Sequence, residues 1–328
     1  MAGQRESKNK KAEAGEFLGP HLLDEYPSMS TTARNWMSAA PKEQWVKDYF
    51  DFLNRQLCSL ELRQRQEMVR RIVASSDNKF HEAIAELVYV ALWNHLKWPF
   101  NKDYQIAGQK PDFRVSFRGP QASFFYSDVT VVRHNHPQRP HKVELDGRGK
   151  IAKLPVVTEP IQQAHRFIMK IKDKFKRYSS KIGEIPFLVC FFQSGFEDCF
   201  YLDDFQIQSA LFGDLKLDFD TGELRYEPSI QNTAHDTRTH GVFGFEEYKS
   251  LTAVIACKEE FYASRGIGCR DERQGYHKPR FGFTVYSNPL GVWAASGINP
   301  FCTEGFPPNG LSDGDTVRFC GAKMVEFW

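Results

Sequence analysis

The sequence lacks the patterns that define several large classes of protein. Its seven cysteines include no C-x-x-C pair, and their scatter suits neither a disulfide framework nor a zinc site. No apolar run approaches the roughly 20 residues of a membrane-spanning helix. The N-terminus is polar and basic rather than signal-like. These absences favour reduced cysteines and a cytoplasmic protein without a membrane partner.

The common catalytic motifs are also missing. There is no G-x-S-x-G, no P-loop and no H-E-x-x-H, and no helix is expected after the Gly266-x-Gly268 pattern. The chain of 328 residues is 41% hydrophobic and 26% charged, which is typical of a soluble globular protein. Its net charge of only +2 argues neither for nor against nucleic acid. Evidence for a nucleic-acid partner must therefore come from local charge.

The strongest local pattern runs from Asp77 to Val132. Apolar residues recur at helical spacing from Phe80 to Leu92, and Asp77 is placed to cap the start of this helix. Two strands are expected next. Residues 112–117 alternate between apolar and polar, and residues 123–132 are rich in aromatic and β-branched side chains. The stretch is therefore predicted to be a helix followed by two strands.

Acidic side chains on this unit are the candidates for chemistry. Glu82 and Glu86 lie four residues apart on the helix, and Glu86 is preferred because it faces the sheet more directly. Asp112 opens the first strand, and Asp128 lies inside the apolar second strand. A buried carboxylate is costly unless a positive group meets it. We expect a Mg²⁺ or Mn²⁺ ion between Asp112, Asp128 and Glu86, since these metals prefer oxygen ligands.

Simpler interpretations of both aspartates remain open at this point. Asp112 could be an ordinary residue at a strand start, and Asp128 could be an edge-strand charge that points to solvent. The order of the elements favours a site, because both aspartates follow an acidic helix and precede a basic one.

The basic helix is predicted at residues 160–178. Its apolar residues form a clean stripe, and over 161–181 its many lysines and arginines accompany a single acid, Asp173. Lys170 and Lys174 are candidates to reach the acidic site, and Gln163 to orient a water there, although a solvated helix face would also explain the lysines. Residues 186–192 follow as a fully apolar strand, as expected at the centre of a sheet.

These residues resemble the PD-(D/E)XK, or restriction-endonuclease-like, nuclease superfamily over roughly residues 78–192. Pro111-Asp112 matches the first half of the motif. Asp128-Val129-Thr130 matches the second half, with Thr130 where the motif has a lysine. The resemblance implies that the carboxylates of Asp112, Asp128 and Glu86 hold the metal. It also implies that Lys170 or Lys174 of the following helix replaces the motif lysine, as in some members of the superfamily.

The resemblance implies an α+β fold with a central mixed sheet flanked by helices, extended by N-terminal helices and C-terminal strands. It implies a metal-dependent nuclease that hydrolyses DNA rather than RNA, in a defence or conflict system. One alternative, favoured by Thr130, is an inactive nuclease-like fold that binds nucleic acid or protein. A second is an interaction protein whose N-terminal helices recruit a partner. Whether the chain binds a protein partner or forms a homodimer stays open.

The remaining segments give weaker expectations. Residues 1–40 are expected to be a disordered or loosely packed tail in which the basic Lys8-Asn-Lys-Lys run could touch phosphates, and 41–328 one domain with insertions. Two helices are expected within 42–75, whose arginines (Arg63, Arg65, Arg70 and Arg71) line a nucleic-acid groove or a solvated face. The long basic loop at 133–159, with three histidines, is a candidate clamp for a phosphate backbone.

Beyond residue 195 we expect a short helix at 203–212 and a hairpin formed by 215–219 and 223–226. A polar loop is expected at 228–240 and an exposed one at 266–278. Strands are expected at 241–245, 250–257, 280–286 and 316–320.

Overall fold

The computed structural model of the chain describes most of its length. The described residues are 16–102, 104–117, 123–131, 144–145, 151–153, 160–193, 202–217, 219, 222, 224–232, 237–260, 280–296, 299–303, 308–310 and 318–326. In the described part, no helix is both long enough and apolar enough to cross a membrane.

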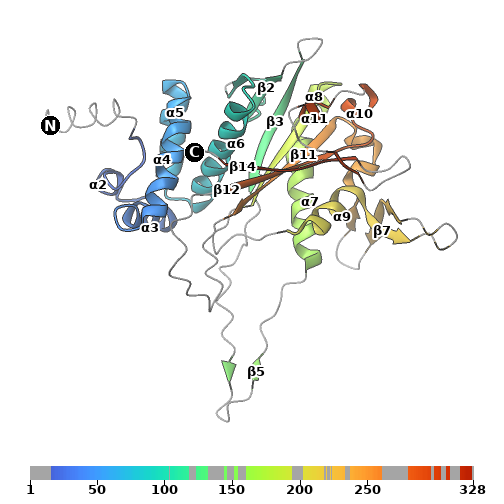
Figure 1. Cartoon of the computed structure of the whole chain (residues 1–328), viewed down its shortest axis with the longest axis horizontal. Helices are drawn as coiled ribbons and strands as arrows, with labels where there is room; N and C mark the ends of the chain where they lie inside the picture. Colours follow the sequence, from blue (N-terminus) through green and yellow to red (C-terminus); the bar gives the residue numbers. More distant parts are fainter. Residues whose placement is uncertain are drawn as a thin grey trace.

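An eight-stranded mixed sheet forms the centre of the protein (Figure 1). Its strands run in the order β1 (Phe100–Asn101), β2 (Phe113–Phe117), β3 (Ser123–Val131), β6 (Phe187–Gln193), β11 (Leu251–Glu260), β12 (Arg280–Ser287), β14 (Arg318–Glu326) and β13 (Pro308–Gly310). Strand β6 is parallel to both of its neighbours, β3 and β11, and the other neighbouring pairs are antiparallel. Helices cover both faces, so the predicted α+β class with a mixed sheet flanked by helices is confirmed.

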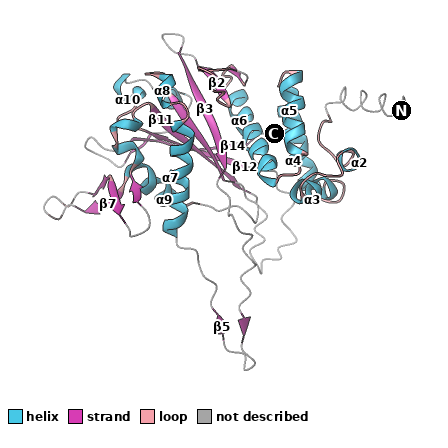
Figure 2. Ribbon diagram, turned by 180° about the vertical axis from the view of Figure 1, so that it is seen from behind, coloured by secondary structure: helices cyan, strands magenta, loops and turns pink. Residues whose placement is uncertain are grey.

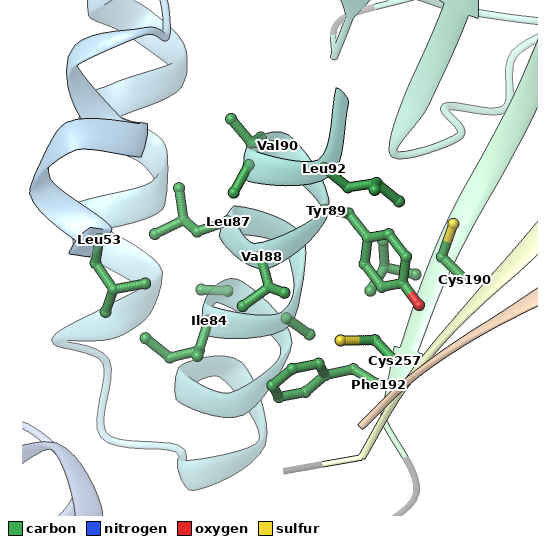
Figure 3. Packing of buried hydrophobic residues seen from close by; sticks show 14 of the residues in the cluster. Leu53, Ile84, Leu87, Val88, Tyr89, Val90, Leu92, Cys190, Phe192 and Cys257 are labelled. Carbon is green, nitrogen blue, oxygen red and sulfur yellow. The ribbon is translucent and has the colours of Figure 1, made fainter. Parts of the chain in front are cut away.

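Helix α6 (Asp77–His95) fills one face of the sheet. Residues 83–93 of this helix are all buried and, apart from Glu86, apolar, as expected for a helix that is covered on every side. Figure 3 shows Leu53 of α4 (Gln44–Cys58) beside Ile84 and Leu87, while the ring of Tyr89 points the other way, toward the sheet. Helix α6 therefore lies between the sheet and the N-terminal helices, which also include α5 (Leu62–Ile72).

The opposite face is covered by α7 (Pro160–Lys176), α8 (Ser179–Ile182) and α9 (Asp204–Phe212) (Figure 2). Phe167 of α7 packs on Phe191 of β6 with ring centroids 4.6 Å apart. Every residue of β6 is buried, as expected for a strand with helices on both sides. The predicted order of helix, two strands, helix and strand is thus confirmed as α6, β2, β3, α7 and β6.

Smaller elements complete the described part of the fold. Three two-stranded ladders are formed by β4 (Glu144–Leu145) with β5 (Ile151–Lys153), β7 (Asp214–Leu217) with β8 (Leu224–Glu227), and β9 (Ser229–Asn232) with β10 (Thr237–His240). The short helices are η1 (Val242–Gly244), η2 (Glu246–Tyr248), α10 (Val292–Ser296) and α11 (Pro300–Thr303). The predicted helix at 203–212 and the hairpin around residue 220 are confirmed, as are the strands at 250–257 and 280–286.

The prediction of a disordered or loosely packed tail is wrong for residues 16–40. Helices α2 (Leu22–Glu25) and α3 (Thr31–Ala39) form there, and Leu18, Leu22 and Met37 are buried in the core around α6. The side chain of Asn54 on α4 accepts hydrogen bonds from the backbone N–H groups of Phe17 and Leu18. Few large apolar residues are needed to order this segment, because they pack in one core with the buried residues of α4. Residues 1–15, with the Lys8-Asn-Lys-Lys run, lie outside the described residues.

Three further local predictions are wrong. Residues 228–240 contain β9 and β10 rather than only a polar loop, and residues 241–245 contain the 3₁₀ helix η1 rather than a strand. Asp77 is the first residue of α6 and not its N-cap. Its carboxylate instead accepts a hydrogen bond of 3.2 Å from the N–H of Thr32 at the start of α3. The predicted short strand at 316–320 corresponds to the longer β14, which begins at Arg318.

Candidate functional site

Asp112 and Asp128 are brought together by the pairing of β2 with β3. Phe113 is paired with Ser127, so Asp112, which precedes Phe113, lies opposite Asp128. The Asp112 carboxylate reaches across to β3, where its Oδ2 accepts a hydrogen bond of 2.7 Å from the N–H of Val129. Asp128 is only 3% exposed in a strand flanked by β2 and β6. The interpretation of Asp128 as an edge-strand charge that points to solvent is therefore wrong.

Both aspartates lie on the face of the sheet that α7 covers. Successive side chains of a strand point to opposite faces. Val129 packs in the core around α6, whereas Tyr126 packs in the core around α7. Asp128, an even number of residues from Tyr126, therefore faces α7, and so does Thr130.

Lys174 of α7 is the lysine that reaches this pair. Its Nζ lies 3.1 Å from Asp128 Oδ2, and its side chain is only 20% exposed. Lys170, one turn earlier on α7, is exposed, as a solvated helix face would have it. Gln163 lies within α7, but its side chain is outside the described residues. Of the three α7 candidates, only Lys174 is therefore placed at the carboxylates by the structure.

Burial and the neighbouring charges shift the pKa values of Asp112 and Lys174. Burial raises the pKa of Asp112 to about 7, helped by the neighbouring Asp128 carboxylate and its hydrogen bond, while Lys174 and Lys102 act in the opposite direction. Burial alone would lower the pKa of Lys174, but Asp128 and Asp112 outweigh burial and raise it above its ordinary value. Near neutral pH, Lys174 is thus a fixed cation, and Asp112 is readily protonated.

Glu86 is buried as predicted, but it is paired with two cations. Arg71 Nη2 of α5 lies 2.6 Å from one of its oxygens, and Lys102 Nζ lies 2.6 Å from the other. Glu82, the less favoured alternative, has a side chain 54% exposed. Within the described ranges, no three His, Cys, Asp or Glu side chains are arranged to hold a metal ion. The expected cluster of Glu86, Asp112 and Asp128 is therefore not assembled, because the two cations occupy both Glu86 oxygens.

A cavity of about 80 Å³ connects Glu86 with Asp112, and Arg71, Lys102 and Lys110 also line it. Lys102 was missed by sequence reasoning. It follows the two-residue strand β1, and its ammonium also lies 4.4 Å from the centroid of the Phe113 ring. No sequence signal could have found it, because its partners come from α6 and β2. A larger cavity of about 670 Å³, between residues 16–20 and α4, contains none of the predicted site residues.

Tyr178, just beyond α7, is a second residue that sequence reasoning placed only in an apolar stripe. Its hydroxyl donates a hydrogen bond of 3.1 Å to the backbone carbonyl of Lys110, two residues before Asp112. Burial, together with the Asp128 and Asp112 carboxylates, raises the pKa of Tyr178. The hydroxyl therefore stays protonated and ties the end of α7 to the approach to β2.

The arginines of α5 do not form one continuous groove. Arg71 is committed to Glu86. Arg65 donates to the carbonyls of Leu57, Cys58 and Leu60, which lie at the C-terminal end of α4 and just beyond it. Arg63 and Arg70 are exposed, as a solvated helix face would have them.

This arrangement fits a divalent cation held by two carboxylates. Two adjacent carboxylates repel each other when both are ionised, and this repulsion adds to the effect of burial, which is the larger cause of the raised pKa of Asp112. Magnesium commonly takes one or two protein carboxylates and completes its shell with water and substrate phosphates. Asp112 and Asp128 supply that donor set without a third acid. Of the predicted basic loop at 133–159, a candidate clamp, only β4 and β5 are described, and its three histidines lie outside the described residues.

Fold and site define a mixed α/β protein with two opposed aspartates and one lysine on the α7 face of its sheet. Comparison of the chain with family models, curated proteins and solved structures gives no match.

Proposed function

We propose that this protein is a metal-dependent nuclease of the PD-(D/E)XK type, which hydrolyses phosphodiester bonds of DNA with Mg²⁺ or Mn²⁺. One observation carries the proposal. Asp112 and Asp128 lie opposite each other on neighbouring strands, and Lys174 of the following helix contacts Asp128 at 3.1 Å. The elements also occur in the order that the resemblance implies, from α6 through β2, β3 and α7 to β6.

In this proposal, Asp112 and Asp128 would hold the metal ion. The bound ion would lower the pKa of a water molecule and stabilise charge on the phosphate. Near neutral pH the chain itself contributes the ionised form of Asp112 only in part, because the pKa of that carboxyl is raised to about 7. Activity should therefore increase as the pH rises through this range.

Lys174 takes the role of the lysine that Thr130 replaces. Thr130 lies on the same face as Asp128, two residues along β3, but its hydroxyl carries no charge. The raised pKa of Lys174 keeps it an ammonium, so it serves as a fixed positive charge and not as a base. A fixed cation beside the reacting phosphate stabilises the negative charge that develops in the transition state.

The proposal is tested by cleavage of plasmid and single-stranded DNA with Mg²⁺, Mn²⁺ or EDTA. Asp128→Asn and Asp112→Asn should each lower the metal-dependent rate by at least about 100-fold, because each loses a charged metal ligand. Glu82→Gln is the matched control, since it also removes one carboxylate from this unit but at an exposed position. Undiminished cleavage by folded Asp128→Asn protein would contradict the proposal.

A second candidate is a nuclease-like fold without catalysis that binds nucleic acid or protein. It is favoured by the ion pairs themselves, because Lys174 offsets the charge of Asp128 and two cations offset the charge of Glu86. The two candidates differ in how folding responds to metal. A nuclease that binds Mg²⁺ through Asp112 and Asp128 should gain thermal stability with increasing Mg²⁺, and Asp128→Asn should remove the gain. A wild-type protein that binds DNA with no such gain and no cleavage would be a binding module.

A further inference from the structure

An arginine held between two aromatic rings lies next to the two aspartates. The guanidinium carbon of Arg114 is 5.0 Å from the ring centroid of Tyr104 and 4.2 Å from that of Phe124. The ring of Tyr126 lies 5.5 Å from each of those rings. We call these four residues the stacking surface, and we propose that it binds unpaired nucleobases, so that the substrate is single-stranded nucleic acid. This inference rests on the proposed function.

The stacking surface continues the candidate site along the same strands. Arg114 follows Asp112 by two residues in β2, and its partner across the ladder is Tyr126, which precedes Asp128 by two residues. A spacing of two residues keeps side chains on one face and separates them by about 7 Å along the strand. A strand of nucleic acid with one phosphate at the aspartates would therefore pass directly over these rings.

The stacking surface is accessible to solvent at the ring of Tyr104. Tyr104 is 36% exposed, and Phe124 and Arg114 are partly exposed, whereas Tyr126 is buried beneath them. Tyr104 precedes a tight hairpin in which Ile106 and Gln109 exchange backbone hydrogen bonds of 2.7 and 2.8 Å. Both central residues of that hairpin have positive φ, as in a type I′ turn. The hairpin restrains the segment that carries Tyr104. Little conformational entropy of this segment is therefore lost when a base stacks on Tyr104.

The charge of the surface matches a nucleic-acid strand. Among the described residues, the Arg114 guanidinium contacts the two rings, and its buried Nε has no hydrogen-bond partner there. A guanidinium held against rings keeps its positive charge and attracts phosphate, while the accessible ring faces stack on bases.

Stacking selects for unpaired bases. In a duplex the faces of each base are covered by its neighbours, so a side chain can reach them only after unstacking. Aromatic platforms combined with positive charge are the usual means of holding single strands without regard to sequence, and each stacked base contributes substantially to affinity. The class of substrate that fits these residues is therefore single-stranded DNA or a single-stranded region within DNA.

The test measures binding by fluorescence anisotropy of a labelled single strand and of the matching duplex, with EDTA present so that no cleavage is required. Tyr104→Ala should weaken single-strand binding by about tenfold, and Tyr104→Phe should restore it, because the ring and not the hydroxyl makes the contact. Phe219→Ala is the matched control. It removes an aromatic ring that is 91% exposed near the β7–β8 hairpin, outside the stacking surface. Circular dichroism of each variant establishes that it is folded.

A second arm replaces the bases rather than the protein. A single strand of the same length with abasic sites keeps its phosphates but cannot stack, so the wild type should bind it about tenfold less tightly than the intact strand. Tyr104→Ala should bind both strands equally. Equal binding of duplex and single strand by the wild type, or equal loss by Tyr104→Ala on both strands, would overturn the inference.

Different results would contradict the proposed nuclease function and the proposed stacking surface. Metal-dependent cleavage of duplex DNA that Tyr104→Ala leaves unchanged would sustain the nuclease and overturn the stacking surface. Base-dependent single-strand binding in a protein that never cleaves would sustain the stacking surface and overturn the nuclease.

Discussion

Lys174 on α7 and Asp128 on β3 form an ion pair of 3.1 Å on the face of the sheet that α7 covers. The pair joins the helix that crosses between β3 and β6 to the strand that carries the second aspartate. A single contact thus positions both the cation of the candidate site and the helix that covers it. Substitutions of Lys174 or Asp128 should therefore change both the cleavage rate and the free energy of unfolding, and each must be measured separately.

Replacing Lys174 should reduce catalysis far more than replacing Lys170. Lys174→Met removes the ammonium at Asp128 while keeping an unbranched apolar stem. The loss of one fixed transition-state charge should lower the cleavage rate on the order of 100-fold. Lys170→Met removes an equal charge from an exposed position of the same helix, one turn away, and should leave the rate within about threefold because exposed charges interact weakly. Rates are compared at saturating Mg²⁺ on one single-stranded and one plasmid substrate.

The same pair of lysine variants tests the role of Lys174 within the proposed nuclease. If both lysine variants cleave equally well, Lys174 is a structural partner of Asp128 and the proposed replacement for the motif lysine is wrong.

The stability of the metal-free protein should decrease as the pH rises from about 4 to about 7. Asp112 has an ordinary pKa near 3.9 when unfolded and a pKa raised to about 7 when folded. Between these values only the folded state holds the proton. The resulting stabilisation is complete below the unfolded pKa and is lost as the pH rises through the folded one, by at most about 1.4 kcal/mol per pH unit. Urea denaturation in EDTA at several pH values measures this slope.

Asp112→Asn supplies the control for that slope. The amide keeps an oxygen that can accept from Val129 N–H but cannot ionise, so the variant should lose the pH dependence and exceed the wild type in stability above about pH 7. Glu82→Gln, at an exposed carboxylate, should keep the wild-type slope. An unchanged slope in Asp112→Asn would show that Asp112 is not the group responsible.

Tyr89 should contribute to stability through its hydroxyl. That oxygen lies 2.9 Å from the carbonyl of Phe191 on β6 and 2.7 Å from that of Ile255 on β11. One proton can be donated to only one of these carbonyls at a time. Tyr89→Phe should therefore cost about 1 kcal/mol in the free energy of unfolding. Tyr26→Phe, at an exposed ring, should cost less than about 0.5 kcal/mol. Equal effects would mean that the buried hydroxyl contributes nothing.

The two aspartates could be predicted from sequence because they violate local rules. A carboxylate in the apolar run of β3 is conspicuous. Asp112 is ordinary at a strand start by itself, and it became a candidate because it follows an acidic helix and precedes Asp128. The helices and central strands could be predicted as well, because their apolar periodicity is strong. β9 and β10 could not, since their side chains are mostly polar and do not alternate with apolar ones.

Contacts between distant segments could not be predicted. Lys170 and Lys174 are one helical turn apart and look alike in sequence, and only the packing of α7 decides which one meets Asp128. Lys102 and Arg71 find Glu86 because α5, α6 and β1 converge there. Asp77 had the correct chemistry for a helix cap, yet Ser76 holds the N-cap position and Asp77 accepts a hydrogen bond from the start of α3. In each case the sequence shows that a charged residue is present, but the tertiary fold decides which partner it contacts.

Glu86 should prove to be a structural charge and not a metal ligand. Both of its oxygens are engaged at 2.6 Å by Arg71 and Lys102. Glu86→Ala leaves two cations without their partner and should cost about 3 kcal/mol in the free energy of unfolding. The double variant Glu86→Gln with Lys102→Met should cost less than the sum of its single variants, because it removes both members of one pair. The Mg²⁺ concentration for half-maximal cleavage should change less than about tenfold in Glu86→Gln, because Asp112 and Asp128 alone supply the charged ligands. A loss of Mg²⁺ affinity as large as that of Asp128→Asn would instead place Glu86 in the metal site and mean that its ion pairs open when the metal binds.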